Sequence, residues 1–580
     1  MRPHRIISLI GSLRGYERES LRDDVLAGLT TAVMLIPQGM GYAMLAGLQP
    51  IHGLYASLLP LVAYALFGTS RQLAVGPVAM VSLLVATGVG ALADAGSTDF
   101  VLYATLLALM VGVLQTLMGI GRLGFLVNFI SHPVISGFTS AAALIIGFSQ
   151  LKHLLGFHIP RNHHIHTIAL HAGSRLEETN SLTLAIGVMG IAILLVLKRC
   201  APRWPRALLV VAAATLLVWG FELDQMGVKV VGQIPTGLPS ITLPSFDPGA
   251  LRELWPIALT IALVGFMESI AVAKKYASLN RYDIDANKEL VGLGIANLAA
   301  AVSQAYPVTG GFSRTAVNAQ AGARTGIATL VTAALVALTL VFLTPLFYYL
   351  PTAVLASIII TAVFSLIDVS EAHHLWKVKR SDLAMLALTF FATLALGIEQ
   401  GIAVGVISSL LVLIYNSTRP HVALLGRLPG TTLYRNLDRF PEAIPTDGVL
   451  AFRLDSQFYF GNVNFLKGTL ERLEATNPRC LRAVVLEANG INAIDASGES
   501  ALREITESYQ RRGVRFILAN LKGPVRDVLE RSNFYDVIGR ENVFHRIEDA
   551  MASLCESENA LGLMHKTRNR NEGEAPNVTI

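Results

Sequence analysis

Charged residues are scarce in this chain. Only 15% of its 580 residues are Asp, Glu, Lys or Arg, against about 25% in soluble domains, while 53% are hydrophobic. This composition indicates that much of the chain lies in lipid. Cys200, Cys480 and Cys555 are too far apart in sequence to suggest a disulfide framework or a metal motif. Basic residues form no stripe that would suggest nucleic-acid binding.

Motifs for nucleotide-driven or catalytic chemistry are not evident either. We find no Walker or Rossmann motif, so we expect no ATP drive and no cofactor. No nucleophile–base pair stands out, which disfavours an enzyme. Nor do we expect a resident metal.

Apolar runs of membrane-spanning length recur from residue 24 to residue 416. Lys and Arg gather in alternate loops, and the loops near 344–349 and 398–400 hold neither. The positive-inside rule therefore predicts a multi-pass protein of the cell inner membrane with both termini in the cytoplasm. We count fourteen spans, at residues 24–47, 53–67, 74–91, 99–119, 131–151, 181–198, 206–221, 254–273, 286–302, 309–321, 326–344, 350–367, 382–398 and 400–416.

Composition changes after Arg419, where charge becomes ordinary and short strands alternate with amphipathic helices. This alternation predicts a small α/β domain at the C-terminus. We expect strands at 448–460, 483–487 and 514–519, and helices at 462–475, 497–511 and 524–531. The predicted domains are a cytoplasmic segment at 1–23, a transmembrane transport domain at 24–418, the α/β domain at 431–555 and a disordered tail at 556–580.

Two of the apolar segments do not fit plain spanning helices. They contain Gly76-Pro77 and Tyr306-Pro307, and each is expected to begin extended, since a residue before proline disfavours the α conformation. They are the third span of the first seven and the third of the second seven. This correspondence predicts an inverted repeat with two half-helices meeting at the membrane midplane. Free N–H groups at two such helix starts would form an anion site. Ordinary kinked helices are the weaker alternative.

Several motifs resemble those of the sulfate-permease (SulP) family. They are Ile36-Pro-Gln-Gly-Met-Gly-Tyr-Ala43, Pro50-Ile-His-Gly-Leu-Tyr-Ala-Ser57 through Arg71, Ala74-Val-Gly-Pro77, Gly310-Gly-Phe-Ser-Arg-Thr315 and Ala321-Gly-Ala-Arg-Thr325. The resemblance implies an all-α membrane protein of fourteen spans in a seven-plus-seven inverted repeat, usually a homodimer. His52 departs from the family, which more often has an aromatic residue there.

The candidate substrate-binding residues lie on span one and at the two half-helix starts. Gln38 and Tyr42, one turn apart, can donate to an anion without carrying charge; helix–helix hydrogen bonding is the alternative. The resemblance favours substrate binding, since the family holds its anion between these elements. Arg314 would supply permanent positive charge, or a charge pair between helices. The full candidate set is Gln38, Tyr42, Gly76, Val78, Ala79, Gly311, Phe312, Ser313 and Arg314, with packing favoured for Phe312.

Glu268 lies inside an apolar span, where an acid is a functional hypothesis by default. The resemblance implicates an acid here in cation coupling, and a plain partner for Arg314 is the alternative. A carboxylate with few oxygen neighbours suits a proton better than sodium.

Six histidines, His153, His158, His163, His164, His166 and His171, share one loop, and their spacing fits no standard metal motif. We expect a solvated loop. In the α/β domain, Ile491-Asn-Ala-Ile-Asp-Ala-Ser-Gly498 resembles the core motif of STAS domains. There Asp495 is followed by Ala496 instead of a phosphorylatable serine, and Ser497 would N-cap the helix. Such a domain could bind a cytoplasmic protein partner.

The sequence thus predicts a secondary transporter of a small inorganic anion, sulfate first, by proton symport. The alternatives are a sodium-coupled bicarbonate or dicarboxylate transporter, an anion exchanger or channel, or a sensor that signals through the soluble domain.

Overall fold

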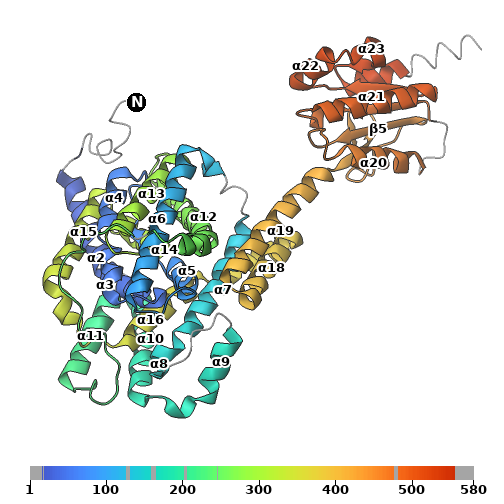
Figure 1. The fold of residues 1–580 in the computed structure, drawn as a ribbon. Helices are drawn as coiled ribbons and strands as arrows, with labels where there is room; N and C mark the ends of the chain where they lie inside the picture. Colours follow the sequence, from blue (N-terminus) through green and yellow to red (C-terminus); the bar gives the residue numbers. More distant parts are fainter. Residues whose placement is uncertain are drawn as a thin grey trace, which may run out of the picture. The chain divides into compact units, whose positions relative to one another are not determined.

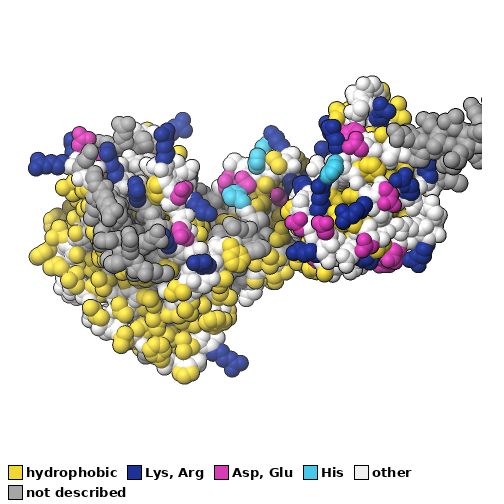
Figure 2. All heavy atoms as spheres, turned by 90° about the horizontal axis from the view of Figure 1, so that it is seen from above, with side chains coloured by type: hydrophobic (Ala, Val, Ile, Leu, Met, Phe, Trp, Pro, Cys, Tyr) yellow, Lys and Arg dark blue, Asp and Glu magenta, His cyan; other side chains and the backbone are white. Residues whose placement is uncertain are grey.

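The structure, a computed structural model, describes residue 16 and residues 18–125, 131–157, 165–201, 206–244, 246–475 and 481–554. The chain divides into two compact units, Met1–Leu410 and Leu411–Ile580 (Figure 1). Figure 2 shows hydrophobic side chains gathered over the first unit, whereas the second carries charged side chains of both signs.

The first unit is built almost entirely of helices. Up to residue 220 they are α2 (Arg18–Ala46), α3 (Pro50–Tyr55), α4 (Leu59–Phe67), α5 (Ala79–Gly90), α6 (Thr98–Ile120), α7 (His132–Ser149), α8 (Leu151–Leu155), α9 (Ile165–Ser174), α10 (Ser181–Cys200) and α11 (Arg206–Gly220). Beyond it they are α12 (Pro248–Leu279), α13 (Ala286–Val302), α14 (Phe312–Gln320), α15 (Ile327–Leu338), α16 (Thr352–Val363), α17 (Val369–Val378) and α18 (Arg380–Leu396), with α19 (Ile398–Thr418) continuing into the second unit.

Each of the fourteen predicted spans overlaps at least one of these helices. Within the described ranges, eight helices are long and apolar enough to cross a membrane, and α5, α11 and α16 are shorter apolar ones. The number of fourteen crossings stays a prediction.

The histidine-rich loop is partly helical. It was expected to be a solvated loop, but α9 covers its second part and packs against α7. His158, His163 and His164 and the side chain of His166 lie outside the described residues, as does the tail from residue 555. His153 and His171 belong to no group of three potential metal ligands in the described part of the chain.

Both expected half-helices are present. The strands β1 (Val75–Gly76) and β2 (Thr309–Gly310) form a two-stranded antiparallel sheet, and α5 and α14 begin just after them. The segments predicted to start extended do so, and the helical parts are shorter than the predicted spans 74–91 and 309–321. Because the two strands run antiparallel, the two half-helices enter the fold from opposite directions.

Helix α2 packs against both half-helices. It contacts α5, α14 and α15, and Figure 1 shows α14 and α5 in the interior of the unit. Glycines bring α2 and α3 unusually close, because a Cβ added at Gly53 would lie 2.0 Å from the carbonyl oxygen of Gly39. A larger residue at Gly53 would therefore displace the part of α2 that carries Gln38.

The second unit contains a six-stranded sheet in the order β4-β3-β5-β6-β7-β8. Strands β5 to β8 are parallel, while β3 pairs antiparallel with both β4 and β5. Its strands are β3 (Val422–Arg427), β4 (Tyr434–Asn436), β5 (Val449–Leu454), β6 (Ala483–Glu487), β7 (Arg515–Ala519) and β8 (Val543–Phe544). Its helices after α19 are α20 (Val463–Ala475), α21 (Ala496–Arg511), α22 (Gly523–Arg531) and α23 (Tyr535–Ile538).

The predicted strand at 448–460 is too long, since β5 ends at Leu454. The next residues turn so that Phe458 forms an isolated bridge with Ile494. The sheet also includes β3 and β4, which were not predicted, and β3 lies before residue 431. Apolar clusters cover both faces of the sheet, which explains why β6 is buried throughout.

Candidate anion-binding site

Two helix starts face each other at the β1–β2 pair. Val78 and Gly311 are the N-caps of α5 and α14, and neither helix has a side-chain cap. The amide of Gly311 donates to the carbonyl oxygen of Ala74 at 3.1 Å, and Ala74 donates to Oγ1 of Thr315 at 3.0 Å. These bonds fix the two starts relative to one another. The positive ends of two helix dipoles therefore converge on one place.

Side chains from neighbouring helices hold the extended segments. Asn297 on α13 accepts from the amide of Val308 at 2.8 Å and donates to its carbonyl oxygen at 3.0 Å. Ser269 on α12 accepts from the amide of Gly310 at 2.9 Å and lies 2.7 Å from the hydroxyl of Thr309. Buried backbone groups of the extended segments, which have no partner within a helix, thus form hydrogen bonds with side chains.

Arg314 is the centre of this arrangement. It is 1% exposed, and its Nη1 donates to the carbonyl oxygen of Pro77. Its Nε and Nη2 are buried and have no hydrogen-bond partner among the residues that the structure describes. A Cβ added at Gly311 would lie 3.0 Å from Nη2, and one added at Gly76, where φ is +149°, would lie 3.5 Å from it. Glycine is favoured at position 311 because a Cβ would crowd the guanidinium, and at position 76 because of the positive φ.

Other polar groups share the interior with Arg314. The charge of Arg314 interacts with Tyr42, Tyr306 and Glu268. Gln38 and Tyr42 are 3% and 5% exposed. Within the described part of the chain, Oε1 of Gln38 and Oε2 of Glu268 are buried without a hydrogen-bond partner. Among the described residues, no ion pair joins Glu268 to Arg314. A fixed charge pair between them, one of the alternatives left open by the sequence, is therefore not what the structure contains.

The remaining predicted residues fall into two groups. Gly76, Val78, Ala79 and Gly311 are buried at the helix starts, where their backbone shapes the site. Phe312 is 42% exposed and Ser313 is exposed as well. Sequence reasoning missed Tyr306, which interacts with the charge of Arg314. Its hydroxyl lies 3.2 Å from the hydroxyl of Ser82. It immediately precedes a proline of the broken segment, which was the available signal.

The loop resembling the STAS motif is well formed in the second unit. Asp495 N-caps α21, with Oδ1 accepting from the amide of Gly498 at 2.7 Å and Oδ2 from the amide of Phe460 at 3.1 Å. Ser497 was expected to N-cap this helix, and that prediction is wrong because Asp495 holds the position. Ser497 is exposed one residue after Ala496, which carries no hydroxyl.

Comparison with known families supplies the identity of the fold. The sulfate permease family matches residues 21–389, and the STAS domain matches residues 440–550. The chain belongs to the sulfate permease family. It is therefore a multi-pass membrane transporter of anions with a C-terminal STAS domain.

The curated relatives span nearly the whole chain. "Sulfate transporter 4.1, chloroplastic" of Arabidopsis thaliana is 41% identical over 549 residues, which are 92% of this chain and 80% of the relative. "High affinity sulfate transporter 2" of Stylosanthes hamata is 36% identical over 562 residues, 93% of this chain and 85% of the relative.

Solved structures share the fold. The murine Solute Carrier 26 family member A9 anion transporter in the inward-facing state has a TM-score of 0.88 at 25% identity, and the match covers 94% of each chain. The transmembrane domain of the cyanobacterium bicarbonate transporter BicA has a TM-score of 0.59 at 24% identity, covering 68% of this chain and 98% of that one.

Proposed function

We propose that this chain takes up sulfate across the cell inner membrane by proton symport, with both termini in the cytoplasm and two copies forming a homodimer. The relatives that cover most of the chain are named sulfate transporters, which supports sulfate over bicarbonate as substrate. The proposed binding residues are Gln38, Tyr42, Gly76, Val78, Ala79, Gly311, Phe312, Ser313 and Arg314.

The observation that carries the anion site is the buried Arg314 guanidinium. A charge buried at such a depth costs several kcal/mol unless it is paired. Nη1 donates to a backbone carbonyl, which is neutral, and the described residues provide no carboxylate in ion-pair contact. Two helix starts add further positive potential at the same place. An anion bound there would accept from Nε, Nη2 and the free amides.

The groups around the site bear on the charge of the anion that it would hold. Gln38 and Tyr42 offer neutral donors, so a divalent oxyanion would be held by one full charge, two dipoles and neutral hydrogen bonds. The site would neutralise only part of the charge of a divalent anion. Weak binding of this kind suits a transported substrate, which must also be released. Glu268 is the proposed coupling residue, because one of its oxygens is buried without a partner close to this site.

The test is uptake of labelled sulfate, bicarbonate, chloride and succinate into vesicles that contain the purified chain. We expect sulfate uptake to saturate and to be lost in Arg314→Ala. Arg175→Ala is the matched control, because Arg175 is exposed and pairs only with Glu178 at 2.7 Å among the described residues. Selective bicarbonate or succinate uptake would contradict the proposed substrate. Sulfate flux that follows the membrane potential alone would indicate a channel.

A further inference from the structure

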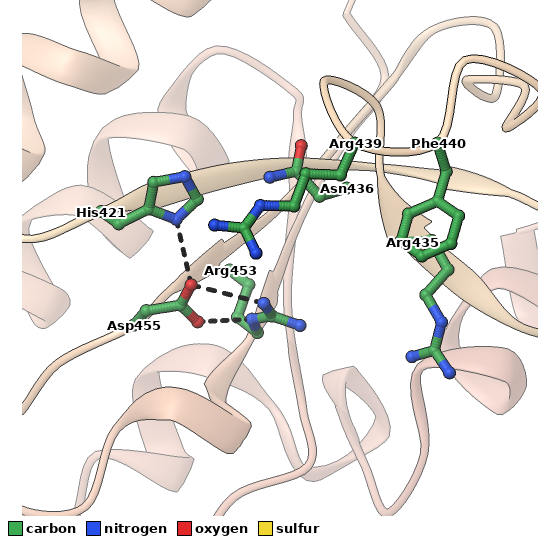
Figure 3. Close-up of a pocket in the computed structure, with 7 residues that line it drawn as sticks. All are labelled: His421, Arg435, Asn436, Arg439, Phe440, Arg453 and Asp455. Carbon is green, nitrogen blue, oxygen red and sulfur yellow. Dashed lines mark hydrogen bonds and ion pairs between the residues drawn. The ribbon is translucent and has the colours of Figure 1, made fainter. Parts of the chain in front are cut away.

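The STAS domain contains a basic pocket that plays no part in the transport site. It has a volume of about 500 Å³ and lies where β3, β4 and β5 meet (Figure 3). Its lining residues are His421, Arg435, Asn436, Arg439, Phe440, Arg453 and Asp455. Three arginines thus surround one pocket that has a single carboxylate in its lining.

That carboxylate is already engaged. Asp455 accepts from Arg453 at 2.5 Å and lies 3.0 Å from Nδ1 of His421. Burial raises the pKa of Asp455, but the hydrogen bonds from Arg453 and His421 outweigh burial, so its pKa lies below the usual value. Asp455 is therefore ionised and forms an ion pair with Arg453. Nε of Arg453 also lies 3.7 Å from Oε2 of Glu487.

Arg439 and Arg435 differ from Arg453. In the part of the chain that the structure describes, neither guanidinium has a hydrogen-bond or ion-pair partner. In Figure 3 the guanidinium of Arg439 points toward the His421–Asp455–Arg453 cluster, whereas Arg435 extends beside Phe440 toward the other end. The pocket therefore has an unneutralised cation near a cluster whose own charges are balanced.

We propose that this pocket binds a small cytoplasmic molecule through a phosphate or sulfate group. Guanidinium forks match the geometry of tetrahedral oxyanions and bind them in a bidentate manner. Arg439 is the main contact and Arg453, held in place by Asp455, is the second. Volumes of this order accommodate organic ligands, and Phe440 offers an apolar face for the rest of such a molecule. A nucleotide and a free inorganic ion share this chemistry, and the experiment separates them.

The experiment measures binding of ADP, inorganic phosphate and sulfate to the purified full-length chain by calorimetry at low ionic strength. All titrations use the Arg314→Ala background, so that sulfate cannot report on the transport site. We expect Arg439→Gln to weaken binding by about tenfold or more, since a charged hydrogen bond is lost. Replacing the Arg439 side chain breaks no hydrogen bond or ion pair among the described residues, so the variant should melt at the same temperature as its parent.

The matched control removes two exposed cations elsewhere in the same domain, Arg540→Gln with Arg546→Gln. These side chains are 78% and 74% exposed. Phe440→Leu separates the two ligand sources, because it should weaken ADP and leave phosphate and sulfate unchanged if a base stacks on the ring. Equal binding of all three probes, lost in Arg439→Gln, would identify an inorganic-ion site. No binding by any probe, or the same loss in the control, would overturn the proposal.

Discussion

The guanidinium of Arg314, on α14, donates to the carbonyl oxygen of Pro77, the residue that precedes the N-cap of α5. One side chain therefore ties the start of one half-helix to the start of the other. The same residue is proposed to bind the anion through the nitrogens that have no protein partner. Positioning of the site and recognition of substrate would then depend on the shape of a guanidinium, not only on its charge.

Arg314→Lys tests this dependence. Lysine keeps the charge, but an ammonium cannot donate in a planar fork to Pro77 and an anion together. We expect sulfate uptake to fall by at least about tenfold in Arg314→Lys, corresponding to the loss of one charged hydrogen bond. Initial rates in vesicles check this, normalised to inserted protein. Wild-type rates in Arg314→Lys would show that charge alone is sufficient.

Asn297 should be important for stability. It is fully buried and makes hydrogen bonds with the backbone of Val308 and with Oε1 of Gln115 at 3.0 Å. In Asn297→Leu, buried groups of both partners would lose their bonds, at a cost of about 1–3 kcal/mol each. We expect a lower melting temperature for the purified chain. Thr260→Ala is the control, since Thr260 is partly exposed and its hydroxyl donates to the carbonyl oxygen of Pro256 in its own helix. An equal decrease there would contradict the assignment.

Two neighbouring acids at the start of α2 should behave differently. Asp24 is buried and accepts from the amides of Arg324 and Thr325 at 2.7 and 3.1 Å and from the hydroxyl of Thr325 at 2.6 Å. Asp23 is partly exposed and pairs with the Arg324 side chain at 2.6 Å.

We expect Asp24→Asn to destabilise the chain by about 1–3 kcal/mol, because an amide group cannot accept through both ends. Asp23→Asn should cost less than about 1 kcal/mol, as exposed ion pairs do. Thermal melts of the two variants provide the comparison. A larger destabilisation by Asp23→Asn would show that the surface ion pair, rather than the buried Asp24 carboxylate, holds the loop before α15.

In the STAS domain, Asp495→Ala should destabilise α21 and the turn around Phe460, because both carboxylate oxygens accept backbone bonds. N-cap loss costs about 0.5–2 kcal/mol. Ser497→Ala should be nearly silent, since Ser497 is exposed. Limited proteolysis of the full chain can compare the two. Phosphate mapped to Ser497 with an effect on transport would show that this exposed hydroxyl is regulatory after all.

The sequence predicted the structure best where a single residue restricts its own neighbours. Pro77 and Pro307 each disfavour helix at the preceding residue, so the two extended segments and the half-helices after them could be predicted. Gln38 and Tyr42 were found because polar residues are conspicuous in an apolar span. The strand ending at Leu454 was predicted too long, because the aromatic residues Phe458, Tyr459 and Phe460 are typical of a strand, although the chain bends at Ser456 before it reaches them.

Long-range partners could not be predicted. Asn297 and Gln115 are 182 positions apart, and nothing near either residue indicates the other. The short strands β3 and β4 lie between the last apolar span and the predicted domain, where no alternating pattern stands out. Whether Glu268 pairs with Arg314 depends on the distance between two helices, which only the folded chain determines.

Glu268 is the residue proposed to couple uptake to protons. Uptake of an anion into an inside-negative cell costs about 2.3 kcal/mol per charge per 100 mV, and twice that for a divalent anion. Accumulation therefore needs cations that enter with the anion or a counter-anion that leaves in exchange. Glu268 is only partly buried, yet one of its oxygens is buried without a partner and makes no ion pair with a described residue. Such a carboxyl group can take up a proton that neutralises part of the sulfate charge.

We expect an inward proton gradient to accelerate sulfate uptake by the wild-type chain and to have no effect in Glu268→Gln. The reason is that an amide cannot exchange a proton, although it preserves the size of the side chain. Glu253→Gln is the matched control, because Glu253 lies on the same helix and is exposed; it should keep the full response. Uptake is measured in vesicles with an imposed pH gradient, with and without sodium. A wild-type chain that responds to sodium but not to protons, or a Glu268→Gln variant that keeps the pH response, would refute proton coupling through this residue.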